Sequence, residues 1–169
     1  FELTSERIYR LLLRMTGNRE DASGLSQETY LKGFTQIEKF DGRSSIATWF
    51  YKIAVNEALQ FLRRANTTRL KLARYALISD NRNGAAETTT VRLDVQEALA
   101  GVKPSDRAIL LLRYQEGLDY RAIGEVIGCS EGTVASRLNR ARGRLRDILQ
   151  KSYDLPEESN ATVHPRSDR

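Results

Sequence analysis

Apolar residues recur at every third or fourth position along most of this chain, and that spacing limits the fold more than any other feature. An α-helix turns once every 3.6 residues, so side chains spaced in this way lie on one face of a helix. Three such faces lie in the first block, at Ile8, Leu11, Leu12 and Met15, at Tyr30, Leu31, Phe34 and Ile37, and at Trp49, Phe50, Ile53 and Phe61. The pattern predicts an all-α protein that begins with a helical bundle.

Polar and glycine-containing segments divide the chain. "TGNRED" and "FDGRSS" separate the first three helices, where Gly17 and Gly42 suit helix ends or turns and Asp21 or Ser23 can cap the second helix. Phe1 stands at the edge of a helical pattern, so we expect native residues upstream of it. We expect two small helical domains at residues 1–65 and 91–150, a flexible linker at 66–90 and a disordered tail at 151–169.

The composition excludes several chemistries. Cys129 and His164 are the only residues of their kinds, which leaves no disulfide framework, no zinc site of paired Cys and His and no Cys/His catalytic pair. Without a carboxylate pair, an activated nucleophile or a glycine-rich phosphate loop, we expect no enzyme, no metal and no cofactor. No apolar run approaches the ~20 residues that cross a bilayer, and no signal peptide opens the chain, so a cytoplasmic protein without membrane insertion is predicted.

The second block contains a helix-turn-helix pattern. "PSDRAILLLRYQEG" is a helix with Ser105 as its N-cap and Gly117 past its end, and Asp119 can cap the next helix, "YRAIGEVIG". Gly128 then makes a short turn, and Ser130 can cap the long helix that follows. Such a turn between two helices allows the second helix to lie in a DNA major groove.

The last helix carries an apolar stripe and a run of arginines together. Its stripe is Val134, Leu138, Ala141 and Leu145, and its arginines are Arg137, Arg140, Arg142, Arg144 and Arg146, with no acid between Arg137 and Arg146. The net charge of +5 also favours a partner of negative sign, such as nucleic acid or anionic lipid. An arginine run can be merely a solvated face, but inside a helix-turn-helix it favours DNA, because phosphate neutralisation is the main sequence-independent source of affinity.

The residues resemble a known family at this point. "EGLDYRAIGEVIGCSEGTVASRLNRARGRL" is similar to region 4 of the extracytoplasmic-function sigma factors, the small two-domain promoter-recognition subunits of bacterial RNA polymerase. Response-regulator DNA-binding domains carry a similar pattern, but "TGNREDASGLSQETYLKGF" and "KFDGRSSIATWFYKIAVNEALQFLRR" resemble sigma region 2, in the matching order and spacing. The resemblance covers roughly residues 7–149 and implies a sigma region 2 bundle followed by a region 4 helix-turn-helix.

The resemblance implies three kinds of site. In the family a Gln-Glu pair meets the clamp helices of the largest polymerase subunit, and this pair is Gln27 and Glu28 here, although Gly24 replaces a usual Asp nearby. The loop that captures a flipped base of the minus-10 element corresponds to Phe40, Asp41, Gly42, Arg43, Ser44 and Ser45, with Asn56 on the next helix. The minus-35 element is expected to meet Glu131, Thr133, Ala135, Ser136, Asn139 and Arg140, and phosphates to meet Arg63, Arg64, Arg137, Arg142 and Arg144.

Each of these sites has a plainer alternative. Gln27 and Glu28 can be a solvated helix face, the loop can be a capped turn, and Arg63 and Arg64 can be linker charge. The implied partners are promoter DNA and core RNA polymerase, through the clamp helices and the flap of the second-largest subunit, and an anti-sigma factor is a further candidate. The alternative function is a free-standing helix-turn-helix regulator whose first domain serves dimerisation or sensing.

Overall fold

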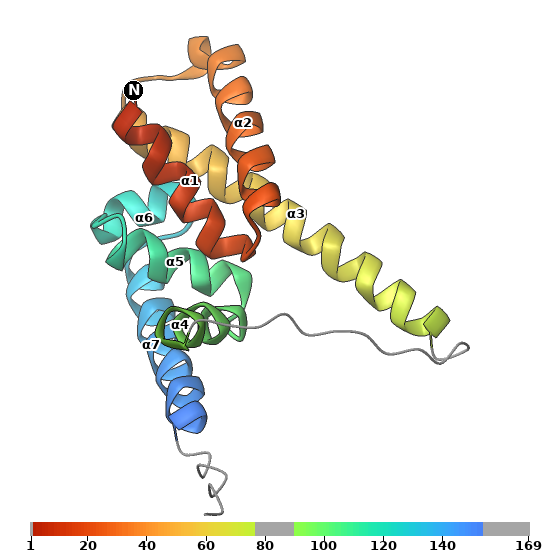
Figure 1. Cartoon of the computed structure of the whole chain (residues 1–169). Helices are drawn as coiled ribbons and strands as arrows, with labels where there is room; N and C mark the ends of the chain where they lie inside the picture. The colour runs from red at the N-terminus through yellow and green to blue at the C-terminus, as the bar shows by residue number, and fades with distance from the viewer. Residues whose placement is uncertain (1, 77–89, 154–169) are drawn as a thin grey trace, which may run out of the picture.

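The computed structural model describes residues 2–76 and 90–153, with side chains described at 4–68 and 95–151 (Figure 1). Every element in these ranges is helical, which confirms the all-α prediction. The α-helices are α1 (Glu2–Thr16), α2 (Arg19–Thr35), α3 (Ile46–Ala76), α4 (Thr90–Ala100), α5 (Pro104–Tyr114), α6 (Tyr120–Ile127) and α7 (Glu131–Tyr153), and a short 3-10 helix, η1, spans Ile37–Lys39. No helix in these ranges is both long and apolar enough to span a bilayer.

Helices α1, α2 and α3 form the first unit, in which each helix packs against the other two. The predicted inner face of α1 is confirmed, since Ile8, Leu11, Leu12 and Met15 are fully buried. The predicted inner face of α2 is only partly confirmed, because Tyr30 packs against the core. Leu31, Phe34 and Ile37, the last of them in η1, are 66%, 54% and 43% exposed.

The buried face of α2 consists instead of Ala22, Leu25, Thr29 and Gly33. Gly33 explains this orientation, because a β-carbon there would lie 2.2 Å from Cε1 of Phe50 on α3. The aromatic ring therefore rests on the bare backbone of α2, and the small side chains allow the two helices to approach closely. Leu31 and Phe34 of α2 are left on the outside.

Helices α4 to α7 form the second unit, which contains the predicted helix-turn-helix. Val134, Leu138 and Ala141 are buried as the stripe on α7 predicted. Gly128 has φ 76°, and Gly124 makes room for the turn, because a β-carbon on it would lie 2.6 Å from the carbonyl oxygen of Cys129. The turn thus depends on glycine at both positions.

The predicted caps are partly confirmed. Asp119 Oδ1 accepts a hydrogen bond from the Ala122 backbone N–H at 2.7 Å, and Ser130 Oγ accepts one from Thr133 at 3.3 Å. Ser105 is not the cap of α5, since the helix begins with Pro104, whose missing N–H suits the first helical position.

Neither Asp21 nor Ser23 caps α2. Asn18 does, because its Oδ1 accepts hydrogen bonds from the backbone N–H groups of Glu20 (2.8 Å) and Asp21 (3.1 Å).

The two units share one hydrophobic core, which joins residues of α1 and α3 to residues of α4, α5 and α6. Figure 1 shows α5 lying against α1 and α3 extending away from the body towards Ala76, and α6 packs against α3. Because α3 continues to Ala76, the first part of the expected linker is helical. The remaining expected linker, 77–89, and the tail from 154 to 169 lie outside the described residues.

Candidate nucleic-acid and polymerase interface

Helix α7 separates its two faces as the sequence predicted. Glu131, Thr133, Ser136, Asn139 and Arg140 are exposed, and Ala135 is half-buried between them and the stripe. The Ser136 hydroxyl donates to the Thr133 carbonyl oxygen at 3.0 Å, whereas the structure gives Asn139 an exposed amide on the same face. An exposed amide carries both a donor and an acceptor, which is the pairing that an adenine edge presents.

The arginines of α7 fall into two groups. Arg140, Arg142 and Arg144 are exposed. Arg137 is mostly buried, and its guanidinium donates to Asp106 Oδ1 of α5 at 2.9 and 3.2 Å. This ion pair joins α7 to α5 and occupies the Arg137 guanidinium, so the geometry does not support the predicted phosphate contact of Arg137. The acidic partner lies thirty-one positions away, which local spacing could not reveal.

Three residues of the predicted minus-10 loop, Asp41, Arg43 and Ser44, line one side of a pocket of about 430 Å³. The pocket is lined by Lys39, Asp41, Arg43, Ser44, Thr48, Trp49 and Lys52 of the first unit and by Arg121 and Glu125 of α6. Gly42 turns the loop with φ 71°, and Phe40 packs against the ring of Trp49 at 5.6 Å. Asn56 is exposed but does not line this pocket. An aromatic wall with several cations suits an unstacked base and its phosphate.

Within the loop, Asp41 and Arg43 are paired and exposed. Arg43 Nε donates to Asp41 Oδ2 at 2.6 Å, and this guanidinium lowers the pKa of Asp41. Ser45 Oγ accepts from the Thr48 backbone N–H at 3.0 Å and so caps α3. The capped-turn alternative therefore holds for Ser45, while the side chains of Arg43 and Ser44 line the pocket.

The outer surface of α2 carries the predicted Gln-Glu pair. Both Gln27 and Glu28 are exposed, and Glu28 forms an ion pair with Lys32 at 3.0 Å. Lys32 also contacts Glu57 of α3, and hydrogen bonds to the two carboxylates raise the pKa of Lys32. Glu28 is thus held in place, and Gln27 stands beside it.

Sequence reasoning missed a functional candidate on this same helix. Leu31 and Phe34 follow Gln27 by one and two helical turns, and both are more than half exposed. Together with Gln27 they make a mixed polar and apolar strip, here called the α2 strip, of the kind that protein partners cover. The only available signal was the pair Ala22 and Gly33, whose small side chains could have indicated the buried face.

Arg63 and Arg64 lie on the exposed side of α3. Arg64 reaches the Gln60 amide oxygen at 3.4 Å, a weak contact that leaves most of its donors for other groups. Helix α3 continues past both residues, so they belong to a helix rather than to a linker.

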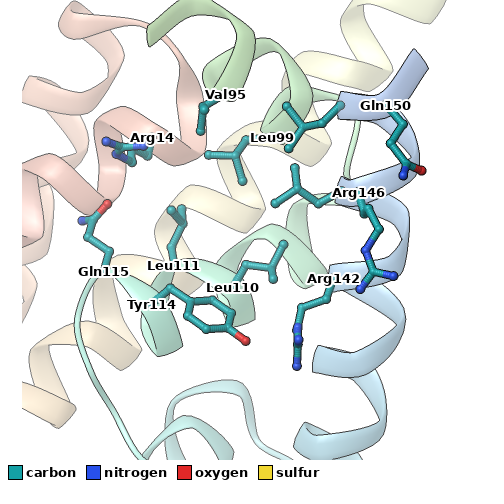
Figure 2. A pocket seen from close by; sticks show the side chains of 12 residues that line it. Arg14, Val95, Leu99, Leu110, Leu111, Tyr114, Gln115, Arg142, Arg146 and Gln150 are labelled. Atoms are coloured by element: carbon teal, nitrogen blue, oxygen red, sulfur yellow. The ribbon is translucent and has the colours of Figure 1, made fainter. Parts of the chain in front are cut away.

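An apolar groove of about 710 Å³ opens between α4, α5 and α7 (Figure 2). Its apolar lining is Val95, Leu99, Leu110, Leu111, Leu145 and Leu149, and its polar lining is Arg14, Tyr114, Gln115, Arg142, Arg146 and Gln150. In Figure 2 Arg142 and Arg146 stand on one side, and Arg14 and Gln115 on the other. Only Arg14 comes from the first unit.

None of these described surfaces contains a group of side chains placed to bind a metal ion. Among the described residues no group of three or more His, Cys, Asp or Glu side chains is placed to hold a metal ion. The described surfaces present hydrogen-bonding amides, guanidinium groups, an aromatic-walled pocket and an apolar groove.

Comparison with known proteins agrees with this arrangement. The family models of sigma-70 region 2 and sigma-70 region 4 match residues 1–68 and 92–145. The ECF RNA polymerase sigma factor SigE of Mycolicibacterium smegmatis is 33% identical over 152 residues, a match that covers 87% of this chain and 59% of that protein. The ECF RNA polymerase sigma-E factor of Haemophilus influenzae is 30% identical over 151 residues, with 82% and 80% covered. The chain therefore belongs to the extracytoplasmic-function group of sigma-70 family RNA polymerase sigma factors.

Solved structures show the same fold. The sigma factor RpoE, solved in complex with the anti-sigma factor NepR from Bartonella quintana, superposes with a TM-score of 0.69 at 22% identity, covering 88% of this chain and 92% of that one. CnrH, in complex with the cytosolic domain of CnrY, superposes with a TM-score of 0.63 at 20% identity, covering 86% and 81%.

Proposed function

We propose that this protein binds core RNA polymerase in the cytoplasm, brings it to promoters with minus-35 and minus-10 elements, and helps to melt them without covalent chemistry of its own. The observation that carries the proposal is the division of α7 into a buried apolar stripe and an exposed polar face on a helix-turn-helix. That division leaves the helix fixed on one side and available to DNA on the other.

The proposed contacts with the minus-35 element come from the exposed face of α7. Asn139 would pair with an adenine edge and Arg140 with a guanine edge, and the exposure of both side chains supports this. Glu131, Thr133, Ala135 and Ser136 complete the surface. Arg142 and Arg144, further along the helix, would contact phosphates, as would Arg63 and Arg64 on α3.

The proposed minus-10 site is the pocket beside the loop at residues 40–45. Unstacking a base costs a few kcal/mol, which a pocket must repay with stacking and hydrogen bonds. Trp49 supplies an aromatic surface, Ser44 a hydroxyl, and Arg43 a guanidinium. Asn56 lies on α3, the helix that carries Trp49, but outside the pocket, and it would contact a neighbouring nucleotide.

Two surfaces are proposed to bind the polymerase. The α2 strip, together with Glu28, would meet the clamp helices, because its apolar side chains are exposed beside the Gln-Glu pair. The apolar groove would receive the flap of the second-largest subunit. Its lining belongs to the second unit apart from Arg14, so the groove persists if the two units move apart.

An anti-sigma factor is a proposed regulatory partner. The two solved structures described above are complexes, one with the anti-sigma factor NepR and the other with the cytosolic domain of CnrY. The similarity of fold supports a partner of the same type for this chain.

In-vitro transcription with core polymerase on a library of promoter sequences tests the function and identifies the preferred elements. We expect initiation that depends on this chain and on both elements. The alternative, a free-standing regulator, predicts DNA binding without stable association with core polymerase in a pull-down.

The double variant Gln27→Ala, Glu28→Ala should weaken polymerase association while its helical content, followed by circular dichroism, stays unchanged.

A further inference from the structure

The pocket beside the loop at residues 40–45 has a mostly cationic lining. Side chains of η1, the loop and α3 line it together with two side chains of α6. Its cationic lining residues are Lys39, Arg43, Lys52 and Arg121, and its acidic ones are Asp41 and Glu125. Because cations outnumber carboxylates in this lining, the pocket favours an anionic ligand.

Two of these cations have no ionic partner among the described residues. Arg43 and Arg121 are each paired with one of the two carboxylates, at 2.5 and 3.4 Å. Lys39 on η1 and Lys52 on α3 are exposed, and in the part of the chain that the structure describes neither ammonium group has a hydrogen bond. An ammonium group has three donors, and its hydrogen bonds to phosphate oxygens are charge-assisted. The two lysines are therefore available to a phosphorylated ligand.

One wall of the pocket is aromatic. Trp49 lines the pocket and is half-buried, and its ring centroid lies 5.6 Å from that of Phe40 and 5.3 Å from that of Phe50. These two rings hold the indole in place, so it forms a fixed surface on which a planar ring can stack. An inorganic phosphate would make no use of this wall. The lining as a whole suits an anion that also carries a base.

The pocket also has hydrogen-bonding groups for the neutral part of such a ligand. Glu125 can accept further hydrogen bonds beyond its ion pair, and the Ser44 hydroxyl reaches only the Ser45 carbonyl oxygen, at the long distance of 3.4 Å. Both groups can therefore bond to the hydroxyls of a sugar. The volume of about 430 Å³ lies within the range of roughly 300–1,000 Å³ that is typical of small-molecule sites.

We propose that this pocket binds a free mononucleotide, with the base on Trp49 and the phosphates at Lys39 and Lys52. Arg121 reaches the same ligand from α6. The inference goes beyond the proposed function, because the ligand is a free nucleotide and not a base of the promoter strand. Since the same pocket is the proposed minus-10 site, a bound nucleotide would compete there with promoter DNA.

The fluorescence of Trp49 tests this proposal directly, because Trp49 is the single tryptophan of the chain. The full-length chain is titrated with ADP, and free N-acetyltryptophanamide serves to correct for absorption by adenine. We expect saturable quenching as the base stacks on the indole. Stacking accepts every base, so ADP is a sufficient probe. Absence of saturable quenching would overturn the proposal.

Adenosine and pyrophosphate each retain one half of the ligand and test whether both halves are needed. Measured by competition against ADP, each should bind at least about tenfold more weakly, because each loses either the charge-assisted hydrogen bonds or the stacking. Equal affinity for ADP and pyrophosphate would show a site for phosphate chains alone. Equal affinity for ADP and adenosine would show stacking on Trp49 alone. Either result would overturn the assignment to a nucleotide.

Substitutions of exposed cations locate the site. Lys52→Ala and Arg121→Ala should each weaken ADP binding severalfold, and because both residues are exposed, the helical content should stay that of the wild type. Arg10→Ala is the matched control, since Arg10 is an exposed cation of α1 outside the pocket lining. It should leave ADP binding unchanged. Equal ADP affinity in all three variants and the wild type would place the nucleotide elsewhere and overturn the proposal.

The titration contains neither polymerase nor DNA, so its outcome is independent of the proposed function. A chain that directs transcription in vitro but does not bind ADP would overturn the nucleotide site alone. A chain that binds ADP as expected but supports initiation at no promoter would keep the nucleotide site and overturn the proposed function.

Discussion

Helices α2 and α7 both carry predicted partner-binding residues, yet they are built in opposite ways. In α7 the large apolar side chains are buried and the exposed face is polar and basic. In α2 three of the four buried residues, Ala22, Thr29 and Gly33, are small, and the large apolar residues Leu31 and Phe34 are exposed. The difference suggests different partners, since a basic polar face suits nucleic acid and an apolar strip suits a protein surface.

The largest expected contrast concerns leucine truncation on the two helices. Leu138→Ala on α7 should lower the free energy of unfolding by about 2–5 kcal/mol, because Leu138 is buried. Leu31→Ala on α2 should change it by less than about 0.5 kcal/mol, since Leu31 is 66% exposed. Urea unfolding measures both. Equal losses would mean that Leu31 is buried in solution and that the contrast between the helices is wrong.

Leu31→Ala has a second expected effect. If the α2 strip meets the polymerase clamp, this variant should weaken core polymerase association while the binding of minus-35 DNA stays as in the wild type. Fluorescence anisotropy with each partner separates the two effects.

Glycine substitution on α2 gives the next contrast. Gly33→Ala should destabilise the fold by about 1–3 kcal/mol, because the new β-carbon would overlap the Phe50 ring. Gly24→Ala lies on the same helix with no described atom within 4 Å of the added carbon, and it should stabilise the helix by about 0.5–1 kcal/mol. Thermal unfolding of the pair should give shifts of opposite sign, and two shifts of the same sign would refute the close approach of α2 and α3.

On α7, substituting a base-contacting residue and substituting a phosphate-contacting residue should have different effects on DNA binding. Asn139→Ala should reduce discrimination by roughly 1–3 kcal/mol at one or two positions of the minus-35 element, with an almost unchanged salt dependence. Arg144→Ala should weaken all sequences alike and reduce the salt slope. The measurement is binding of the full-length chain with core polymerase to single-base promoter variants at several salt concentrations. If Asn139→Ala weakened binding to all promoter variants equally, α7 would contact only the phosphates and not the base edges.

A small stabilising effect, like that of Gly24→Ala, is expected from Gly143→Ala, an exchange in the interior of α7 with no described atom within 4 Å of the added carbon. It should stabilise the chain by about 0.5–1 kcal/mol, because alanine restricts the unfolded chain more than glycine does. Chemical denaturation measures it. A loss of stability would indicate that another element packs against this part of α7.

Features set by neighbouring residues were predictable from the sequence. The stripe on α7, the cap at Asp119 and the turn at Gly128 depend on spacing and on local backbone chemistry, and all three are as predicted. The face of α2 was not predictable in this way, because large apolar residues outweighed the small ones in the pattern. Gly33 is decisive only through Phe50, a contact that spacing within α2 does not show.

The candidate sites also include some features that local spacing predicts and others that depend on contacts between distant segments. The exposed residues on α7 follow from the helical period, but the pairing of Arg137 with Asp106 depends on how α5 and α7 cross. Glu116, in the turn between α5 and α6, is buried against Arg7 of α1 and Tyr51 of α3, which are distant from it in sequence. Nothing in the local pattern distinguishes these charged residues from solvated ones, so the contact between the units was beyond sequence reasoning.

The shared hydrophobic core has a consequence for the lifetime of the protein. Side chains of α1 and α3 are buried together with those of α4 to α6, so separating the units uncovers apolar surface on both. An opened chain that finds no partner exposes this surface to proteases and to other unfolded chains. A chain whose units are held apart without a partner should therefore be degraded faster than the closed chain.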